Sequence, residues 1–140
     1  MRFDRHRLVN GCYALLWFPW IVWASLRLSW WYPRRRLDQL TNIMSDVFVS
    51  PTVWPRQPER LRSVVHFVRP VLPPFGMGAC LKSSLILLDI MARARVPVTF
   101  HLGVASDHQD RAFHAWVESK ALKTERLPLQ YRELWCWSRS

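Results

Sequence analysis

The spacing of apolar residues changes once along this 140-residue chain, just after Pro97. Before that proline, apolar residues recur every three or four positions, which predicts α-helices. After it, Val98, Phe100, Leu102 and Val104 alternate with Thr99, His101 and Gly103, which predicts a strand with one buried face. Helices first and strands afterwards predict an α+β fold, in which helices pack on a small, mainly antiparallel sheet.

Three helices are predicted between the N-terminal region and Pro97, from about Asp38 to Val49, from Pro58 to about Val68, and from Cys80 to about Arg95. Pro58 suits the first position of a helix and Glu59 suits its first turn. The third helix is expected to bury one face, formed by Leu81, Leu85, Leu88 and Ala92. A second strand is predicted over Phe113–Glu118, with Phe113, Ala115 and Val117 toward the core and His114, Trp116 and Glu118 on the opposite face.

The N-terminal part holds an uncharged run, Val9–Leu26, between arginines. No small-residue cleavage site follows it, so it is not a signal peptide. Trp17, Trp20 and Trp23 recur at helical spacing, which predicts one apolar stripe. A buried or interfacial helix is favoured, and insertion into a bilayer stays open. We therefore expect a hydrophobic helical segment over residues 1–50 and a core domain over residues 51–140.

Twenty basic and ten acidic side chains give the chain a net charge of +10, which favours an anionic partner. Nucleic acid is not expected, because no nucleic-acid motif is present and the tryptophans gather in the least charged segment. The arginine run at positions 34–36 could contact anionic lipid headgroups. Three separated cysteines without a Cys-x-x-Cys pair indicate a reducing compartment, and the scattered histidines predict neither a metal nor a cofactor.

Cys80 follows a Pro- and Gly-rich loop and opens a predicted helix, and His114 follows on a predicted strand. A helix N-terminus carries partial positive charge and unpaired N–H groups, which favour a thiolate. A histidine that reaches such a thiol can take its proton and deliver it to a leaving amine. This pattern predicts a thiol nucleophile, Cys80, and its base, His114; the backbone N–H of Cys80 is one expected oxyanion donor, and the second is unassigned.

An acidic residue is expected to orient His114. Glu118 is excluded as a direct partner because four residues along a strand span roughly 13 Å. If the chain turns about Ser119-Lys120, Glu125 lies directly opposite His114 with its Cβ about 5 Å away. Glu125 is therefore the predicted third residue, although a solvated charge beside Lys123 and Arg126 is an open alternative.

These residues resemble the stand-alone leader peptidases of lasso-peptide biosynthesis, a family within the papain/transglutaminase-like superfamily. The resemblance spans about Pro73 to Glu125. It rests on Ala79-Cys80-Leu81 with Ser83 and Ser84, on Val96-Pro97, on Leu102-Gly103-Val104, and on Phe113-His114-Ala115-Trp116-Val117-Glu118.

The resemblance implies a peptidase that removes the leader from a ribosomally made precursor peptide, with Cys80 as nucleophile and His114 as base. The family's third residue is usually an Asp on the strand after the histidine, and here Glu125 stands one position earlier than that place. The implied partners are the precursor, a separate leader-recognition protein and an ATP-dependent, asparagine-synthetase-like cyclase. The implied location is the cytoplasm, with contact to the inner face of the membrane as a further expectation.

Two other functions compete with a peptidase. A non-enzymatic adaptor would use the positive charge and the Trp-rich helices to bind a membrane or a partner protein. A transglutaminase-like amide transferase would use the same thiol, but an amine instead of water would resolve its thioester.

Overall fold

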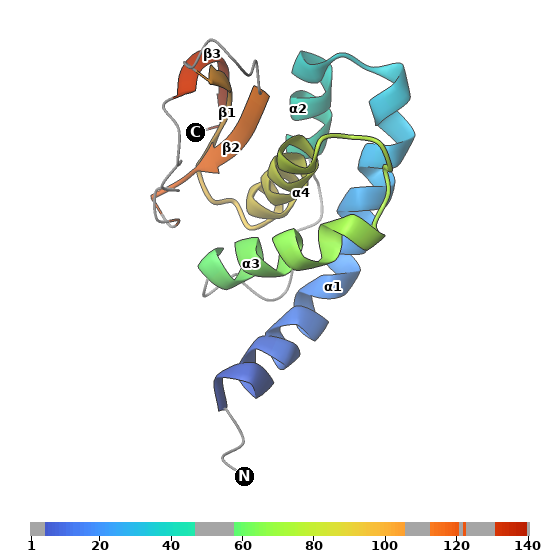
Figure 1. Ribbon diagram of the computed structural model, residues 1–140, viewed down its shortest axis with the longest axis vertical. Helices are drawn as coiled ribbons and strands as arrows, with labels where there is room; N and C mark the ends of the chain where they lie inside the picture. Colours follow the sequence, from blue (N-terminus) through green and yellow to red (C-terminus); the bar gives the residue numbers. More distant parts are fainter. Residues whose placement is uncertain (1–4, 47–57, 106–112, 121, 123–130, 140) are drawn as a thin grey trace.

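The computed structural model describes residues 5–46, 58–105, 113–120, 122 and 131–139. Helices come first and a small antiparallel sheet follows, as the change of spacing at Pro97 predicts (Figure 1). In chain order the elements are α1 (Arg5–Trp31), the 3-10 helix η1 (Tyr32–Arg34), α2 (Leu37–Ser45), α3 (Pro58–Val68), the 3-10 helix η2 (Arg69–Val71), α4 (Ala79–Arg93), β1 (Val98–Ala105), β2 (Phe113–Glu118) and β3 (Tyr131–Arg139).

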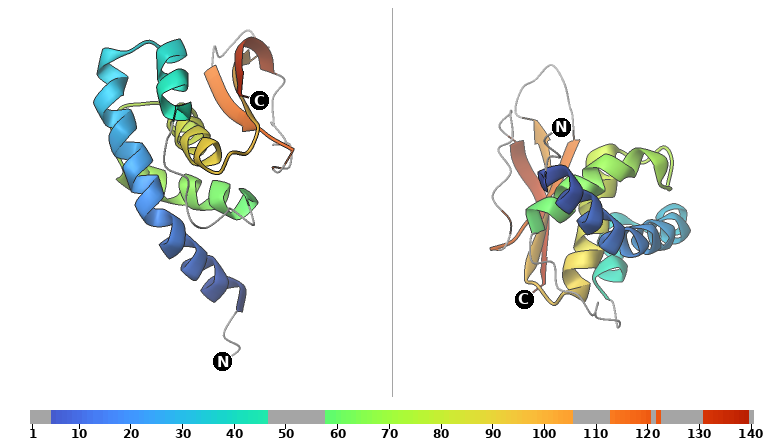
Figure 2. Two further views of the ribbon diagram at one scale, coloured as in Figure 1. Left: turned by 180° about the vertical axis from the view of Figure 1, so that it is seen from behind. Right: turned by 90° about the horizontal axis from the view of Figure 1, so that it is seen from below.

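Helix α4 lies at the centre of the molecule, between the sheet and the other three α-helices (Figures 1 and 2). Every residue from Lys82 to Arg93 is buried. The expectation of a single buried face is therefore wrong, because neighbours cover this helix on all sides. Its polar side chains are tolerated there because they bond to other elements, as Ser84 does through its hydroxyl to the Ala115 carbonyl at 2.9 Å.

The sheet has the strand order β2-β1-β3, and both pairings are antiparallel. Across the first pair, His114 lies opposite Gly103 and Trp116 opposite His101. The third strand pairs with β1, and a register shift between Leu102 and Gly103 interrupts that ladder. Among the described residues, β2 is paired on one side only, which leaves His114 on an edge strand.

Strand β2 does not alternate as the sequence predicts. Ala115 and Val117 face the core, but Phe113 is 65% exposed and Trp116 is only 9% exposed. The expectation that Phe113 packs in the core is therefore wrong, whereas Trp116 lies on the face opposite the core, as predicted, and is buried there. Trp116 is covered on the far face of the sheet by aromatic and histidine rings, which a period-two pattern cannot register.

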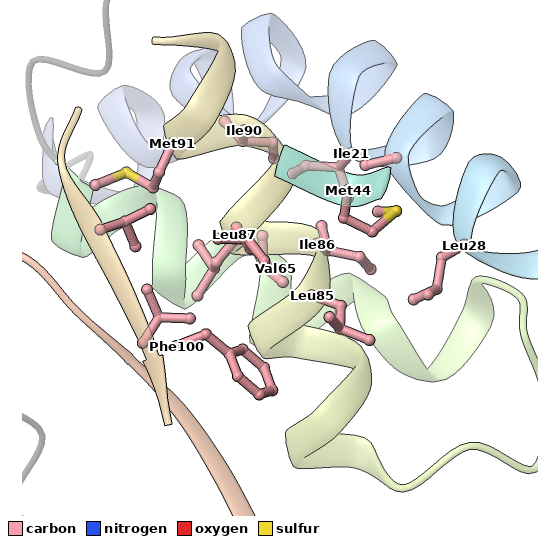
Figure 3. Close-up of a cluster of buried hydrophobic side chains, with 14 of the residues drawn as sticks. Ile21, Leu28, Met44, Val65, Leu85, Ile86, Leu87, Ile90, Met91 and Phe100 are labelled. Carbon is pink, nitrogen blue, oxygen red and sulfur yellow. The ribbon is translucent and has the colours of Figure 1, made fainter. Parts of the chain in front are cut away.

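A single cluster of buried side chains connects the helices to the sheet (Figure 3). Ile21 and Leu28 come from α1, and Val65 comes from α3. Around them lie Met44 of α2, Leu85, Ile86, Leu87, Ile90 and Met91 of α4, and Phe100 of β1. Residues on both sides of the predicted boundary at position 50 thus contribute to one core, while the boundary itself stays a prediction.

Helix α1 has one buried stripe and one exposed stripe. Trp17 and Ile21 are buried, whereas Leu15, Trp23 and Trp30 are 53–75% exposed. The predicted stripe of three tryptophans is wrong, because each three-residue step turns about 60° short of a full circle and places Trp17 and Trp23 on different sides. No helix among the described residues has the length and hydropathy needed to cross a bilayer.

A buried carboxylate joins the helices. Asp89 of α4 is fully buried and bonds to Arg27 of α1 and to Arg93 one turn later, each at 2.5 Å. Burial raises the pKa of Asp89, and the two guanidinium groups oppose that rise. Arg27 also donates to the Ile43 carbonyl of α2 at 2.8 Å. One acid thus ties α1, α2 and α4 together.

We predict that Asp89→Ala lowers the free energy of unfolding by about 3–5 kcal/mol, because it removes the buried carboxylate that pairs with both Arg27 and Arg93. Asp38→Ala is the matched control, since Asp38 and Arg36 form an exposed pair at 3.8 Å. That control should change stability by less than about 1 kcal/mol. Urea unfolding measures both variants, and equal effects would show that Asp89 does not join the helices.

Candidate active site

Cys80 is the second residue of α4 and is half-buried, whereas Cys12 and Cys136 are exposed. Helical bonding begins when the Lys82 N–H reaches the Gly78 carbonyl at 3.0 Å. The Cys80 N–H therefore precedes the first intrahelical bond and points out of the helix end, beside the thiol. Both the helix dipole and such amides favour negative charge at this position.

The loop before Cys80 is fastened to its surroundings. Lys82 is 5% exposed and donates to the carbonyls of Arg69 at 2.8 Å and Leu72 at 2.6 Å. Burial and the nearby Arg69 lower the pKa of Lys82 below its usual value. On the α1 side, the Ser25 hydroxyl donates to the Pro73 carbonyl. The position of Cys80 is thus fixed by contacts on both sides of the loop.

Cys80 and His114 line one small pocket between α3, the start of α4 and β2. Its volume of about 20 Å³ has room for roughly one water molecule. The structure therefore brings together the two residues that the sequence pairs as nucleophile and base. The other lining residues are Arg62, His66, Ser83, Ser84, Leu87, Ala115, Trp116 and Val117.

His114 is held by ring contacts. Its imidazole stacks on Tyr131 of β3 with centroids 5.0 Å apart and on Trp116 with centroids 5.9 Å apart. The Nε2 atom is buried and has no hydrogen-bond partner within the described part of the chain. An imidazole nitrogen without a hydrogen-bond partner can exchange a proton with a reacting group.

Two acidic residues of the sheet contact His101. His101 of β1 contacts Glu133 through Nδ1 and lies 3.5 Å from Glu118 through Nε2. Glu118 also accepts a hydrogen bond from the Trp116 indole at 3.2 Å. Glu118 thus contacts His101 and Trp116, and among the described residues no hydrogen bond or ion pair joins it to His114.

Glu125, the predicted third residue, lies outside the described residues, so its role stays a prediction. The strand after β2 that the structure does describe, β3, pairs with β1 and carries Tyr131, which stacks on His114. Within the described residues, no hydrogen bond or ion pair links His114 to a carboxylate.

The sequence analysis assigned no role to His66 or Arg62, yet both line the pocket from α3. They are four positions apart in a predicted helix and therefore share a face. The spacing alone predicts that the two side chains lie on the same face of the helix. It does not predict which other helix or strand packs against that face. Across the described ranges, no group of three or more His, Cys, Asp and Glu side chains is placed to hold a metal ion.

The model of the transglutaminase-like superfamily matches residues 20–135. This chain belongs to the transglutaminase-like superfamily. No curated protein and no solved structure matches it. The superfamily is generally enzymatic and includes cysteine peptidases and amide transferases. For this transglutaminase-like protein, a thiol at a helix N-terminus and an imidazole in one pocket are the groups that acyl transfer through a thioester requires.

The position of the Trp116 ring, on which His114 stacks, depends on a glycine in β1. A Cβ atom on Gly103 would lie 3.0 Å from both the Trp116 ring and the Arg132 carbonyl. Only a residue without a side chain lets the Trp116 indole lie across β1 and reach His114.

We predict that Gly103→Ala lowers the free energy of unfolding by about 1–3 kcal/mol, since Trp116 and a backbone carbonyl must move. Gly78→Ala is the control, because a Cβ there meets nothing within 4 Å and the backbone has an ordinary φ of −53°. That change should stay within about 1 kcal/mol. Chemical denaturation measures the free energy of unfolding of both variants. A Gly103→Ala variant as stable as the wild type would show that Trp116 is not tightly packed over Gly103.

Proposed function

We propose that this protein is a cysteine peptidase that removes the leader from a lasso precursor peptide. The observation that carries the proposal is the shared pocket of Cys80 and His114. The family supports thiol acyl-transfer chemistry, and the sequence around Cys80 and over Phe113–Glu118 supports the lasso leader peptidases within it.

The reaction proceeds by acyl transfer. The Cys80 thiolate attacks the scissile carbonyl, and the new S–C bond moves electrons onto the carbonyl oxygen. That oxyanion accepts a hydrogen bond from the Cys80 backbone N–H. The intermediate collapses, the C–N bond breaks, and His114 gives the departing amine its proton. Water, deprotonated by His114, then hydrolyses the thioester and restores the thiol.

Hydrolysis and amide transfer would proceed through the same Cys80 thioester. Water resolves it in a peptidase, whereas an amine resolves it in the competing amide transferase. The mass of the product separates the two reactions, because only the transferase leaves the amine attached.

The proposed partners follow from charge and from the resemblance. A net charge of +10 suits an acidic leader peptide. A leader-recognition protein and an asparagine-synthetase-like cyclase complete the proposed cytoplasmic pathway. Arg34 and Arg35 follow α1 and lie over Trp30 and Trp31 at its end, 4.6 and 5.3 Å from the ring centroids. This combination of tryptophan and arginine supports contact with an anionic membrane surface.

We predict that Cys80→Ala and His114→Ala each abolish leader removal while the protein stays folded. Mass spectrometry of a lasso precursor, incubated with the protein and the recognition protein from the same gene neighbourhood, measures the cleavage. Cys136→Ala is the control, since Cys136 is exposed on β3 and should be dispensable. A non-enzymatic adaptor would keep its binding function after Cys80 is alkylated.

Glu125→Ala should reduce cleavage strongly and Glu118→Ala should reduce it less, because Glu118 serves His101 and Trp116. The same precursor assay compares the two variants. A more damaging Glu118→Ala would show that the predicted hairpin register, which places Glu125 opposite His114, is wrong.

A further inference from the structure

A second histidine of the sheet, His101 of β1, has no part in the proposed mechanism. Its imidazole stacks on the Trp116 indole, with ring centroids 5.1 Å apart and planes 9° apart, and Trp116 in turn stacks on His114. We propose that His101 is a positioning residue for His114 and acts through Trp116. This inference rests on the proposed role of His114 in proton transfer and deepens it.

The register of the sheet brings these three rings together. Residues two apart on a strand share one face, and directly opposed residues of neighbouring strands share it too. His101 lies opposite Trp116, and Gly103 lies opposite His114. Because Gly103 has no side chain, the Trp116 indole extends over it, 3.0 Å from the place that a Cβ would take. Trp116 therefore contacts His101 across the strand pair and His114 along its own strand.

Two carboxylates from the neighbouring strands hold His101. Glu133 of β3 contacts Nδ1, and a carboxylate oxygen of Glu118 on β2 lies 3.5 Å from Nε2. Only 13% of the His101 side chain is exposed, against 47% for each acid. Glu118 also accepts a hydrogen bond from the Trp116 indole N–H at 3.2 Å. One carboxylate thus contacts both rings, which fixes the indole relative to the imidazole.

The orientation of His114 depends on ring contacts. Its Nε2 atom has no hydrogen-bond partner among the described residues, and its ring stacks on Trp116 and Tyr131. Removal of the His101 imidazole would open a space beside the Trp116 indole, into which the indole can turn. The His114 ring would then lose one of the two rings that support it.

His101 is not proposed as a second base. It is not among the residues that line the pocket of Cys80 and His114. Each of its ring nitrogens faces a carboxylate, Glu133 at Nδ1 and Glu118 at Nε2. Its effect on the reaction is therefore expected through the position of His114, not through proton transfer by its own ring.

The first measurement reads the position of His114 by NMR. Ring currents of Trp116 and Tyr131 displace the imidazole proton signals of His114, so these signals report how the rings stack. Their absence in His114→Ala assigns them. We expect His101→Ala to move these signals in the folded protein, and His101→Phe to move them less, because Phe keeps a flat ring beside Trp116. Thr99→Ala is the control, since Thr99 is two residues from His101 on the same face of β1, and it should leave them unchanged.

The second measurement is the cleavage of a lasso precursor in the presence of its recognition protein. We expect His101→Ala to lower kcat about ten- to a hundredfold and to leave KM within about twofold, because a misplaced base slows proton transfer but not binding. His101→Phe should recover most of the lost rate, and Thr99→Ala should change neither constant. Urea unfolding of each variant separates these effects from misfolding.

Three results would overturn the proposal: unchanged His114 signals in His101→Ala, an unchanged kcat in that variant, or a His101→Phe variant as impaired as His101→Ala. If His101→Ala does not fold, His101→Gln takes its place, since it lacks the ring but keeps a donor for Glu133. A wild-type protein that cleaves no precursor, while the His114 signals respond as expected, would instead contradict the proposed peptidase function and support the positioning of His114 by His101.

Discussion

The burial of α4 from Lys82 to Arg93 is the constraint on which the rest of the structure depends. A helix covered on all sides over three turns has one position in the fold, which also determines where its first turn lies. The ion pairs of Asp89 with Arg27 and Arg93 and the apolar contacts around Leu85 and Ile90 hold it there. Cys80 thus gains a defined place at the edge of the core without being buried itself.

The pocket forms where α3 and β2 meet that first turn. The hydroxyl of Ser84 joins α4 to β2, the strand of His114, and the side chains of Lys82 and Ser83 join it to Arg69 of η2, directly after α3. Each of these residues is polar and buried, and each uses its polar atom to set the distance between two elements. Polar groups in the core of α4 therefore contribute to positioning the site.

Local signals predicted most of the fold. Pro58 and the following residues predicted the bounds of α3 as observed, and the α+β order followed from the change of period at Pro97. Cys80 and His114, which the sequence pairs as nucleophile and base, line the same pocket, and their catalytic roles stay predictions. The place of His66 in the pocket and the place of Trp116 over Gly103 were not predicted from the sequence. Both depend on contacts between distant segments, α3 against α4 and an indole against β1. Hydrophobic periodicity reports the side of an element that is buried, not the partner that buries it.

The central proposal is that Cys80 is the nucleophile and that His114 takes its proton. The most direct measurement is the rate of alkylation by iodoacetamide at each of Cys12, Cys80 and Cys136, followed by peptide mass spectrometry at about pH 6, where an ordinary thiol is almost fully protonated. The account predicts that half-buried Cys80 reacts about tenfold or more faster than the two exposed cysteines, and that His114→Ala removes this advantage. A Cys80 that reacts more slowly than both, with or without His114, would contradict it.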